Sequence, residues 1–301
     1  MFNNEQPEIP GKLVFSTPDG NGNYQIYTSL TNGENRKQLT HFKNDGAYSP
    51  AWSPDGKQIV FGRTNTTTSP GYYITIMNAD GSGKQQLEGV LDGRAVNVVG
   101  DHPKWSPDGT KIAFDRCLDC ELGGGNSELF VYDLDTNTIT QLTDNFSKDS
   151  FPKWKNNFEL FFTSDRDFFK SDSVEFFRDL YTIRTTDLFV RRITESGNFG
   201  SFAHGTKSNS LLIRPFYSEN QDWFTLNLES NRTSEIEIPN QININLTAPL
   251  EWSEEKNLVL LRTLENSGFK FTYFNLQTNQ IFKVNEELWK ILGLDWYYDE
   301  E

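Results

Sequence analysis

His41, His102 and His204 are the only histidines in the chain, and they are the side chains best suited to bind a transition metal. Asp101 stands directly before His102, and Asp149 holds a comparable place in a later segment. Imidazole nitrogens and carboxylate oxygens together bind divalent first-row metals. A mixed cluster could therefore hold a divalent ion, with His102 and His204 as candidate ligands. Scattered histidines are more often surface or hydrogen-bonded residues, so we expect no cofactor.

Cys117 and Cys120 form a lone Cys-x-x-Cys pair, followed by the segment "ELGGGN". A zinc site would need a second pair, and the chain has two cysteines. A thioredoxin-like pair stands at a helix start, where the helix dipole lowers the thiol pKa, whereas this pair lies in a loop between two strands. We expect a local disulfide or two free thiols, with the disulfide favoured in an oxidising compartment.

No nucleophile stands at a recognisable spacing from a base in this sequence. The Gly-x-Ser-x-Gly turn of α/β-hydrolases is also missing. We therefore expect no catalytic residue.

The elements that would position these side chains come from an internal repeat. Two segments are similar in sequence: "SPAWSPDGKQIVF" at 49–61 and "HPKWSPDGTKIAF" at 102–114. Each predicts a short strand ending at Trp, a Ser-Pro-Asp-Gly turn and a second strand, because Pro presets φ and Gly supplies the positive φ of a tight reversal. Each copy continues with an aromatic strand, a polar turn and a short fourth strand.

Weaker copies of this four-strand unit follow at intervals of about 50 residues, which is typical of β-propellers. The expected blades 2 to 6 lie at about 48–90, 101–144, 150–195, 200–239 and 247–284. A short helix is expected at 285–292, "NEELWKIL". No helical segment recurs between strands, which excludes a TIM barrel or a doubly wound sheet. A two-sheet sandwich is the alternative, but a regular four-strand period is not its signature.

Blade 1 is expected to combine the two ends of the chain. Residues 11–40 supply a second, third and fourth strand but no first strand, and residues 1–10 form an extension. The missing first strand is "GLDWYYDEE" at 293–301, because Trp296 aligns with Trp52 and Trp105. This pairing would close a single six-bladed domain and protect two strand edges. Trp296 is then a packing residue.

The segments "AWSPDGKQIVF" and "KWSPDGTKIAF", with "IYTSLTNGENRKQLT" and "IMNADGSGKQQLE", resemble the repeat of TolB-like six-bladed propellers. The resemblance implies an all-β fold and no particular activity, because members have unrelated functions. TolB itself is a periplasmic scaffold that docks a lipoprotein and carries an additional α/β domain. Prolyl-oligopeptidase relatives join the propeller to a hydrolase domain, and oligogalacturonate lyases hold a divalent metal with several histidines in the channel.

In a propeller, these residues would lie at or near the innermost strands. His102 would precede the innermost strand of blade 3, Phe151 would begin the innermost strand of blade 4, and His204 would lie within the innermost strand of blade 5. We expect a partner-binding funnel mouth that includes Asp101, His102, Asp149, Phe151 and His204. The segment "DFFKSDSVEFFRDLY" at 167–181 lengthens a loop of blade 4. Exposed aromatic clusters are enriched at interfaces, so the loop is a second candidate contact, although the rings could simply extend a hairpin. Its aromatic residues are Phe168, Phe169, Phe176 and Phe177.

Charge and hydropathy argue against some classes of binding partner. A formal net charge of −14 and the lack of a basic run argue against nucleic acid. No apolar stretch is long enough for a membrane span. The polar start "MFNNEQPEIPGK" is not a signal peptide, so we expect a cytoplasmic protein, or a periplasmic or secreted one if a leader has been removed.

These observations favour a monomeric, non-catalytic propeller that acts as a scaffold and binds a protein or peptide. The alternative is a propeller enzyme or carbohydrate-binding module that uses the central funnel, possibly with a metal near His102 and His204 in the manner of an oligogalacturonate lyase.

Overall fold

The structure is a computed structural model that describes most of the chain. The described residues are 9, 11–64, 72–118, 125–167, 178–195, 197, 199–205, 209–215, 223–238, 247–265, 268–283 and 293–298. The helix expected at 285–292 and the four phenylalanines of the blade 4 loop lie outside these residues. Within them every regular element is a strand, and no helix that could cross a membrane is found.

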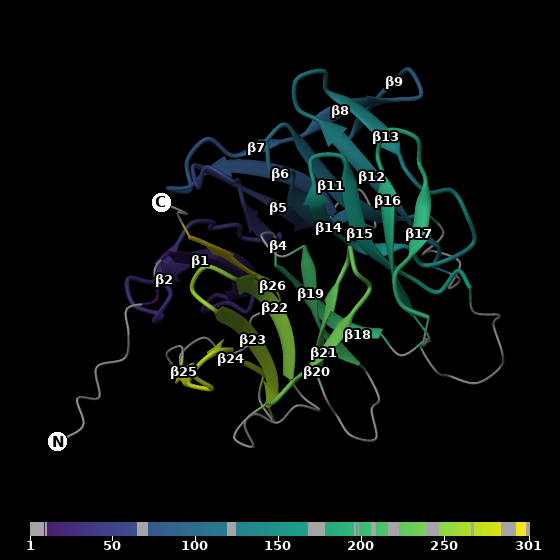
Figure 1. Cartoon of the computed structure of the whole chain (residues 1–301). Helices are drawn as coiled ribbons and strands as arrows, with labels where there is room; N and C mark the ends of the chain where they lie inside the picture. The colour runs from purple at the N-terminus through teal and green to yellow at the C-terminus, as the bar shows by residue number, and fades with distance from the viewer. Residues whose placement is uncertain are drawn as a thin grey trace.

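Six sheets surround a central axis as the blades of a propeller (Figure 1). Successive strands within a blade pair antiparallel, and the first strand of each blade lies innermost. Blades 1, 2 and 3 consist, from the axis outward, of β26 (Gly293–Tyr297), β1 (Lys12–Pro18), β2 (Tyr24–Leu30) and β3 (Lys37–Gln38); β4 (Ala47–Trp52), β5 (Gln58–Thr64), β6 (Tyr72–Asn78) and β7 (Gln85–Gln86); and β10 (Asp101–Trp105), β11 (Lys111–Cys117), β12 (Ser127–Asp133) and β13 (Thr138–Gln141). Blades 4, 5 and 6 consist of β14 (Ser150–Asn156), β15 (Glu159–Ser164), β16 (Asp179–Arg184) and β17 (Val190–Arg192); β18 (Phe199–Gly205), β19 (Ser210–Pro215), β20 (Trp223–Asn227) and β21 (Thr233–Ile236); and β22 (Thr247–Ser253), β23 (Leu258–Glu265), β24 (Gly268–Asn275) and β25 (Ile281–Lys283).

The two ends of the sequence meet in blade 1, which confirms the predicted ring closure. β26 pairs antiparallel with β1, with Trp296 opposite Leu13 and Leu294 opposite Phe15. Trp296 is 5% exposed and packs edge-on against Tyr273 of blade 6, with ring centroids 5.1 Å apart. It is therefore a packing residue between blades.

The Ser-Pro-Asp-Gly turns hold their shape through side-chain hydrogen bonds. Ser53 Oγ donates to Asp55 Oδ1 at 2.7 Å and accepts from the backbone N–H of Gln58 at 2.9 Å. Gly56 has a φ of 65°, a conformation that an L-residue adopts at a cost. The same pattern recurs at 106–111 in blade 3. The repeat is thus turn chemistry, as its composition indicates.

Blade 3 carries an additional hairpin that the repeat does not predict. β8 (Glu88–Leu91) and β9 (Arg94–Asn97) pair antiparallel, and β8 then pairs parallel with β13 through Val90 and Thr138. The hairpin turns at Asp92 and Gly93, both with positive φ, which is a common two-residue reversal. It covers the outer edge of blade 3, where open strand edges invite pairing with other chains.

Candidate functional site

Three innermost strands begin with the same strained feature. Ser49, His102 and Phe151 each precede a proline and have φ values of 50°, 49° and 58°. Positive φ is uncommon for residues other than Gly, and such strain persists where the surrounding structure enforces it. Strand pairing shifts register at each of these places, as in a β-bulge, which redirects side chains.

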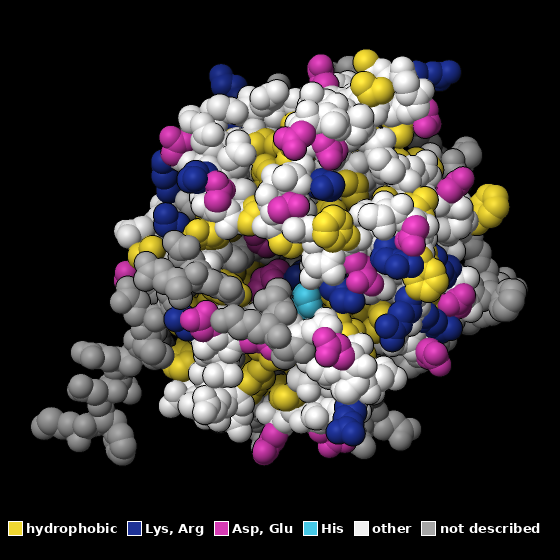
Figure 2. All heavy atoms as spheres, turned by 45° about the horizontal axis from the view of Figure 1, so that its top comes forward, with side chains coloured by type: hydrophobic (Ala, Val, Ile, Leu, Met, Phe, Trp, Pro, Cys, Tyr) yellow, Lys and Arg dark blue, Asp and Glu magenta, His cyan; other side chains and the backbone are white. Residues whose placement is uncertain are grey.

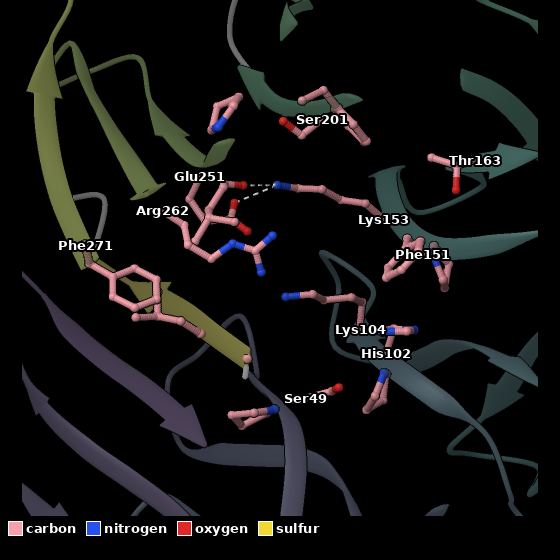
Figure 3. Close-up of a pocket in the computed structure, with 18 of the residues that line it drawn as sticks. Ser49, His102, Lys104, Phe151, Lys153, Thr163, Ser201, Glu251, Arg262 and Phe271 are labelled. Carbon is pink, nitrogen blue, oxygen red and sulfur yellow. Dashed lines mark hydrogen bonds and ion pairs between the residues drawn. The ribbon is translucent and has the colours of Figure 1, made fainter. Parts of the chain in front are cut away.

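The three strained residues line one cavity at the mouth of the funnel. Its volume is about 350 Å³, and every blade contributes to its wall. Most of the wall is apolar, whereas charged side chains from β10, β14, β22 and β23 converge toward its centre (Figure 3). The apolar lining consists of Pro50, Pro103, Phe151, Pro152, Phe199, Phe202, Pro249, Leu250, Phe271 and Leu294.

The charged residues belong to one layer of the funnel, at the position directly before the repeat tryptophan. Strand register places Ala51, Lys104, Lys153, Ala203, Glu251 and Asp295 at this position in blades 2, 3, 4, 5, 6 and 1. Two neighbouring blades thus carry lysine, two carry acids, and alanine stands between the pairs. We call Lys104, Lys153, Glu251 and Asp295 the charged belt.

Each of two ion pairs joins blades that flank a blade with alanine at this position. Lys104 Nζ lies 2.7 Å from Asp295 Oδ1, and Lys153 Nζ lies 2.7 Å from Glu251 Oε2. Asp295 Oδ2 also accepts the backbone N–H of Trp52 at 2.8 Å, which ties blade 1 to blade 2. A smaller cavity of about 180 Å³ is lined by all four belt residues, and three of them, Lys104, Lys153 and Glu251, also line the larger cavity. The charged belt therefore divides the channel.

The carboxylates of the charged belt keep Lys104 protonated. Burial lowers the pKa of Lys104, but the charges of Asp295 and Glu251 outweigh it and raise the pKa above its usual value. Arg262, which also lines the cavity, has its pKa lowered by burial and by the charge of Arg214. The cavity wall thus carries Lys104, Lys153 and Arg262 against one carboxylate, Glu251, in a chain with a formal net charge of −14.

His102 lines the cavity and is oriented by the buried carboxylate of Asp115. Its Nδ1 lies 2.9 Å from Asp115 Oδ1, and its ring packs against that of Phe151 with the centroids 4.2 Å apart and the planes tilted by 44°. Asp101 Oδ1 accepts from Ser49 Oγ at 3.0 Å. Burial lowers the pKa of His102, but the charge and hydrogen bond of Asp115, with the charge of Asp101, raise it above its usual value.

His204 occupies a different environment from His102. In the strand register His204 lies opposite Leu211, just as Trp52 lies opposite Ile59 in blade 2 and Trp105 opposite Ile112 in blade 3. His204 therefore occupies the tryptophan position of blade 5. The side chain is 6% exposed, packs edge-on against Phe161 and does not line the funnel-mouth cavity. Burial, with the charges of Lys153 and Lys155, lowers its pKa to about 3. Its role in the structure is core packing.

The remaining candidates are not gathered at the cavity. Asp149 is fully buried and accepts from Ser164 Oγ, Asn145 Nδ2 and Arg166 Nη2 at 2.5, 2.8 and 2.6 Å. It braces the start of blade 4 instead of facing the funnel. His41 is exposed and lies outside the cavity wall.

No group of three or more metal-binding side chains occurs in the portion of the chain that the structure describes. The expected disulfide cannot be placed, because Cys120 lies outside the described residues. The same applies to Phe168, Phe169, Phe176 and Phe177, so the blade 4 loop stays a prediction.

Reasoning from the sequence missed the charged belt, although a signal was present. Aligning the repeats on tryptophan puts Lys104, Lys153, Glu251 and Asp295 in one column, before Trp105, Trp154, Trp252 and Trp296. Equivalent positions on innermost strands share one level of a channel, so the column predicts a ring of complementary charges.

The closed ring, the innermost strands and the axial cavity define a six-bladed β-propeller. Comparison with solved structures adds that its fold is that of the TolB-like propellers. Superposition on TolB from Acinetobacter baumannii gives a TM-score of 0.69 at 17% identity, covering 95% of this chain and 66% of that chain. This chain therefore spans just under two thirds of that TolB.

Similar folds also occur in proteins of other kinds. A chain of the nidogen/laminin complex matches with a TM-score of 0.63 at 10% identity, covering 95% of this chain and 98% of that one. Oligogalacturonate lyase in complex with manganese matches with a TM-score of 0.53 at 12% identity, covering 93% and 88%. No protein-family model and no curated protein matches the sequence. Identities this low show a shared fold alone.

Proposed function

We propose that this protein is a non-catalytic propeller that binds a protein or peptide partner, and that the funnel-mouth cavity receives part of that partner. The observation that supports this most is the cavity itself, an apolar hollow with a few convergent charged groups, which is typical of binding sites. Its volume of about 350 Å³ suits a few side chains of a segment and not a folded domain.

The charges of the wall favour an acidic group in that segment. Lys104, Lys153 and Arg262 of the wall outnumber the carboxylates even when Asp295, the partner of Lys104, is counted with Glu251. An incoming carboxylate could exchange with either carboxylate of the charged belt. Apolar side chains of the segment would pack on Phe151, Phe202 and the prolines. Phe168, Phe169, Phe176 and Phe177, in the loop after β15, are proposed to extend this contact. A monomer in the periplasm or outside the cell would fit such a scaffold.

The competing proposal is an enzyme or a carbohydrate-binding module in the same funnel. The pair of His102 and Asp115 favours it, because a carboxylate that orients a histidine is a frequent arrangement for proton transfer. A divalent metal at His102 and His204 is supported less, since only His102 lines the cavity and its Nδ1 already contacts Asp115.

Peptide display on the purified protein tests the proposal. We expect peptides with Asp or Glu beside apolar residues, and at least tenfold weaker binding of a selected peptide to Phe151→Ala or Arg262→Ala. Phe146→Ala is the matched control, because Phe146 is 87% exposed and does not line the cavity. If every selected peptide, including those that Leu188→Asn does not affect, bound wild type and Phe151→Ala equally, the funnel would be removed from the proposal. Oligosaccharide binding that depends on His102 would favour the competing one.

A further inference from the structure

Three large apolar side chains lie exposed on neighbouring turns of blade 4. Phe158 is 61% exposed in the turn between β14 and β15, and Leu188 and Phe189 are 46% and 55% exposed in the turn between β16 and β17. The backbone N–H of Thr185 donates to the carbonyl of Phe158 at 2.9 Å, so the two turns are joined. We call Phe158, Leu188 and Phe189 the blade 4 patch.

Leu188 stands where the chain elsewhere uses asparagine. The fourth residue after the end of the third strand is Asn137 in blade 3, Asn231 in blade 5 and Asn279 in blade 6, with φ of 56°, 54° and 57°. Leu188 holds the same position in blade 4 with a φ of 58°. Asparagine adopts this left-handed conformation readily, whereas a leucine is strained in it. Blade 4 thus retains a residue that is both strained and exposed.

The first turn of blade 4 also has an apolar residue where the repeat has one that suits a turn. Blades 2 and 3 place Asp-Gly in this turn, at 55–56 and 108–109, whereas blade 4 has Asn157 and Phe158. In two turns of a single blade, residues that suit a turn, glycine and asparagine, are therefore replaced by the apolar Phe158 and Leu188. Neither replacement contributes to the core, because both side chains are exposed. Contiguous exposed apolar residues indicate an interaction surface.

The surroundings of the blade 4 patch are basic, in contrast to the protein as a whole. Arg184 lies over the ring of Phe189 at 4.8 Å, and Arg191 on the edge strand β17 is exposed. In the part of the chain that the structure describes, Arg191 forms no ion pair, whereas Arg184 pairs with Asp187 at 2.8 Å. Lys and Arg side chains gather right of the centre in Figure 2 and border exposed hydrophobic ones, on the side where Figure 1 places β14 to β17. A partner complementary to this surface is acidic.

We propose that the blade 4 patch docks an acidic segment of another protein that carries apolar side chains. Its apolar groups pack on Phe158, Leu188 and Phe189, and its carboxylates face Arg184 and Arg191. The surface is separate from the funnel mouth. Phe151 lines the funnel near the start of β14, and Phe158 follows its end, about 20 Å away for a strand of this length.

Leu188→Asn is the sharpest test, because it restores the residue found at this position in blades 3, 5 and 6. We expect this variant to melt about 2 °C higher than wild type as strain is relieved. Peptides selected by display on the protein are expected to include acidic, apolar sequences that bind Leu188→Asn and Phe158→Asn at least tenfold more weakly. Phe151→Ala should leave the affinity of those peptides unchanged, which separates this surface from the funnel.

Several results would overturn the proposal. Selected peptides could be basic or uncharged, or could bind Leu188→Asn as well as wild type. A lower melting temperature for Leu188→Asn would show that the leucine is required by the fold. Sedimentation could instead show a wild-type dimer that the variants dissociate, in which case the occupant is a second copy of this chain.

Discussion

Lys104 and Asp295 lie 191 positions apart in the sequence, and their side chains meet at 2.7 Å inside the funnel. Lys104 belongs to blade 3 and Asp295 to the strand that closes blade 1, so the ion pair spans blade 2 above Ala51. Asp295 also accepts the backbone N–H of Trp52. One carboxylate therefore links three blades.

Removal of Lys104 should cost more than removal of a surface lysine. Lys104→Ala leaves the mostly buried Asp295 without its cation, so we expect the free energy of unfolding to fall by about 2 kcal/mol. Lys57→Ala is the control, because Lys57 is 79% exposed beside Asp55 and should change stability by less than about 0.5 kcal/mol. Urea unfolding measures both. Equal effects of the two substitutions would mean that the funnel pair is solvated like a surface pair.

Loss of β26 should destabilise the ring more than loss of one contact. Deletion of 293–301 exposes β1 along Leu13, Val14 and Phe15, so we expect a marked fall in melting temperature. Trp296→Ala keeps the strand and should cost about 3–5 kcal/mol by leaving a cavity beside Tyr273. An unchanged melting transition after the deletion would contradict closure by β26.

Acid should weaken the protein through His204. Its pKa is about 3 in the folded state, whereas an unfolded histidine titrates near 6.5. Between these values the unfolded chain binds a proton that the folded chain does not. The free energy of unfolding should therefore fall by about 1.4 kcal/mol for each unit of pH below 6.5.

The comparison of variants isolates this effect. His204→Trp restores the residue of the other blades, and His204→Gln serves if the larger ring does not fit; either should flatten the acid slope. His41→Gln, at an exposed position, should not. His102 acts in the opposite direction, because its raised pKa adds stability below about pH 6.5 that is lost as pH rises through its folded pKa. An acid slope that survives in both His204 variants would refute the assignment.

Metal should not be bound tightly at the funnel mouth. We expect elemental analysis of the purified protein to show no stoichiometric manganese or zinc, and added Mn²⁺ to leave the melting temperature unchanged. The reason is that His102 Nδ1 is engaged by Asp115 and that His204 does not line the cavity. A rise in melting temperature with Mn²⁺ that is absent in His102→Ala would instead support the metal-dependent enzyme.

The repeat predicted the fold because its residues act locally. Pro and Gly of the turns at 53–56 and 106–109 specify hairpins wherever they occur, and Trp52 and Trp105 mark the ends of the innermost strands of blades 2 and 3. Closure by Trp296 could be predicted in the same way. The repeat does not predict the β8–β9 hairpin, because this hairpin lies between two copies of the repeat, although Asp92 and Gly93 are a turn signal.

The candidate site was harder to predict, because it depends on relations between blades. His102 lines the funnel-mouth cavity, but the strain at Ser49, His102 and Phe151 follows from bulges that no residue pattern specifies. His204 looked like a ligand because its blade has lost the tryptophan against which it should have been aligned. Its partner Leu211 reveals the equivalence only once strands are paired.

The pairing of β1 with β26 also has a consequence for how the protein is made. Translation proceeds at about 5–20 residues per second, so β26 leaves the ribosome roughly 15 to 60 seconds after β1. Throughout that interval the inner edge of β1, from Lys12 to Ser16, has no partner from its own blade. Ring closure is therefore necessarily a late, non-local step, which makes folding slow and leaves the nascent chain open to association. A chaperone that shields this edge would be expected to raise the yield of folded protein more than one that acts on any later blade.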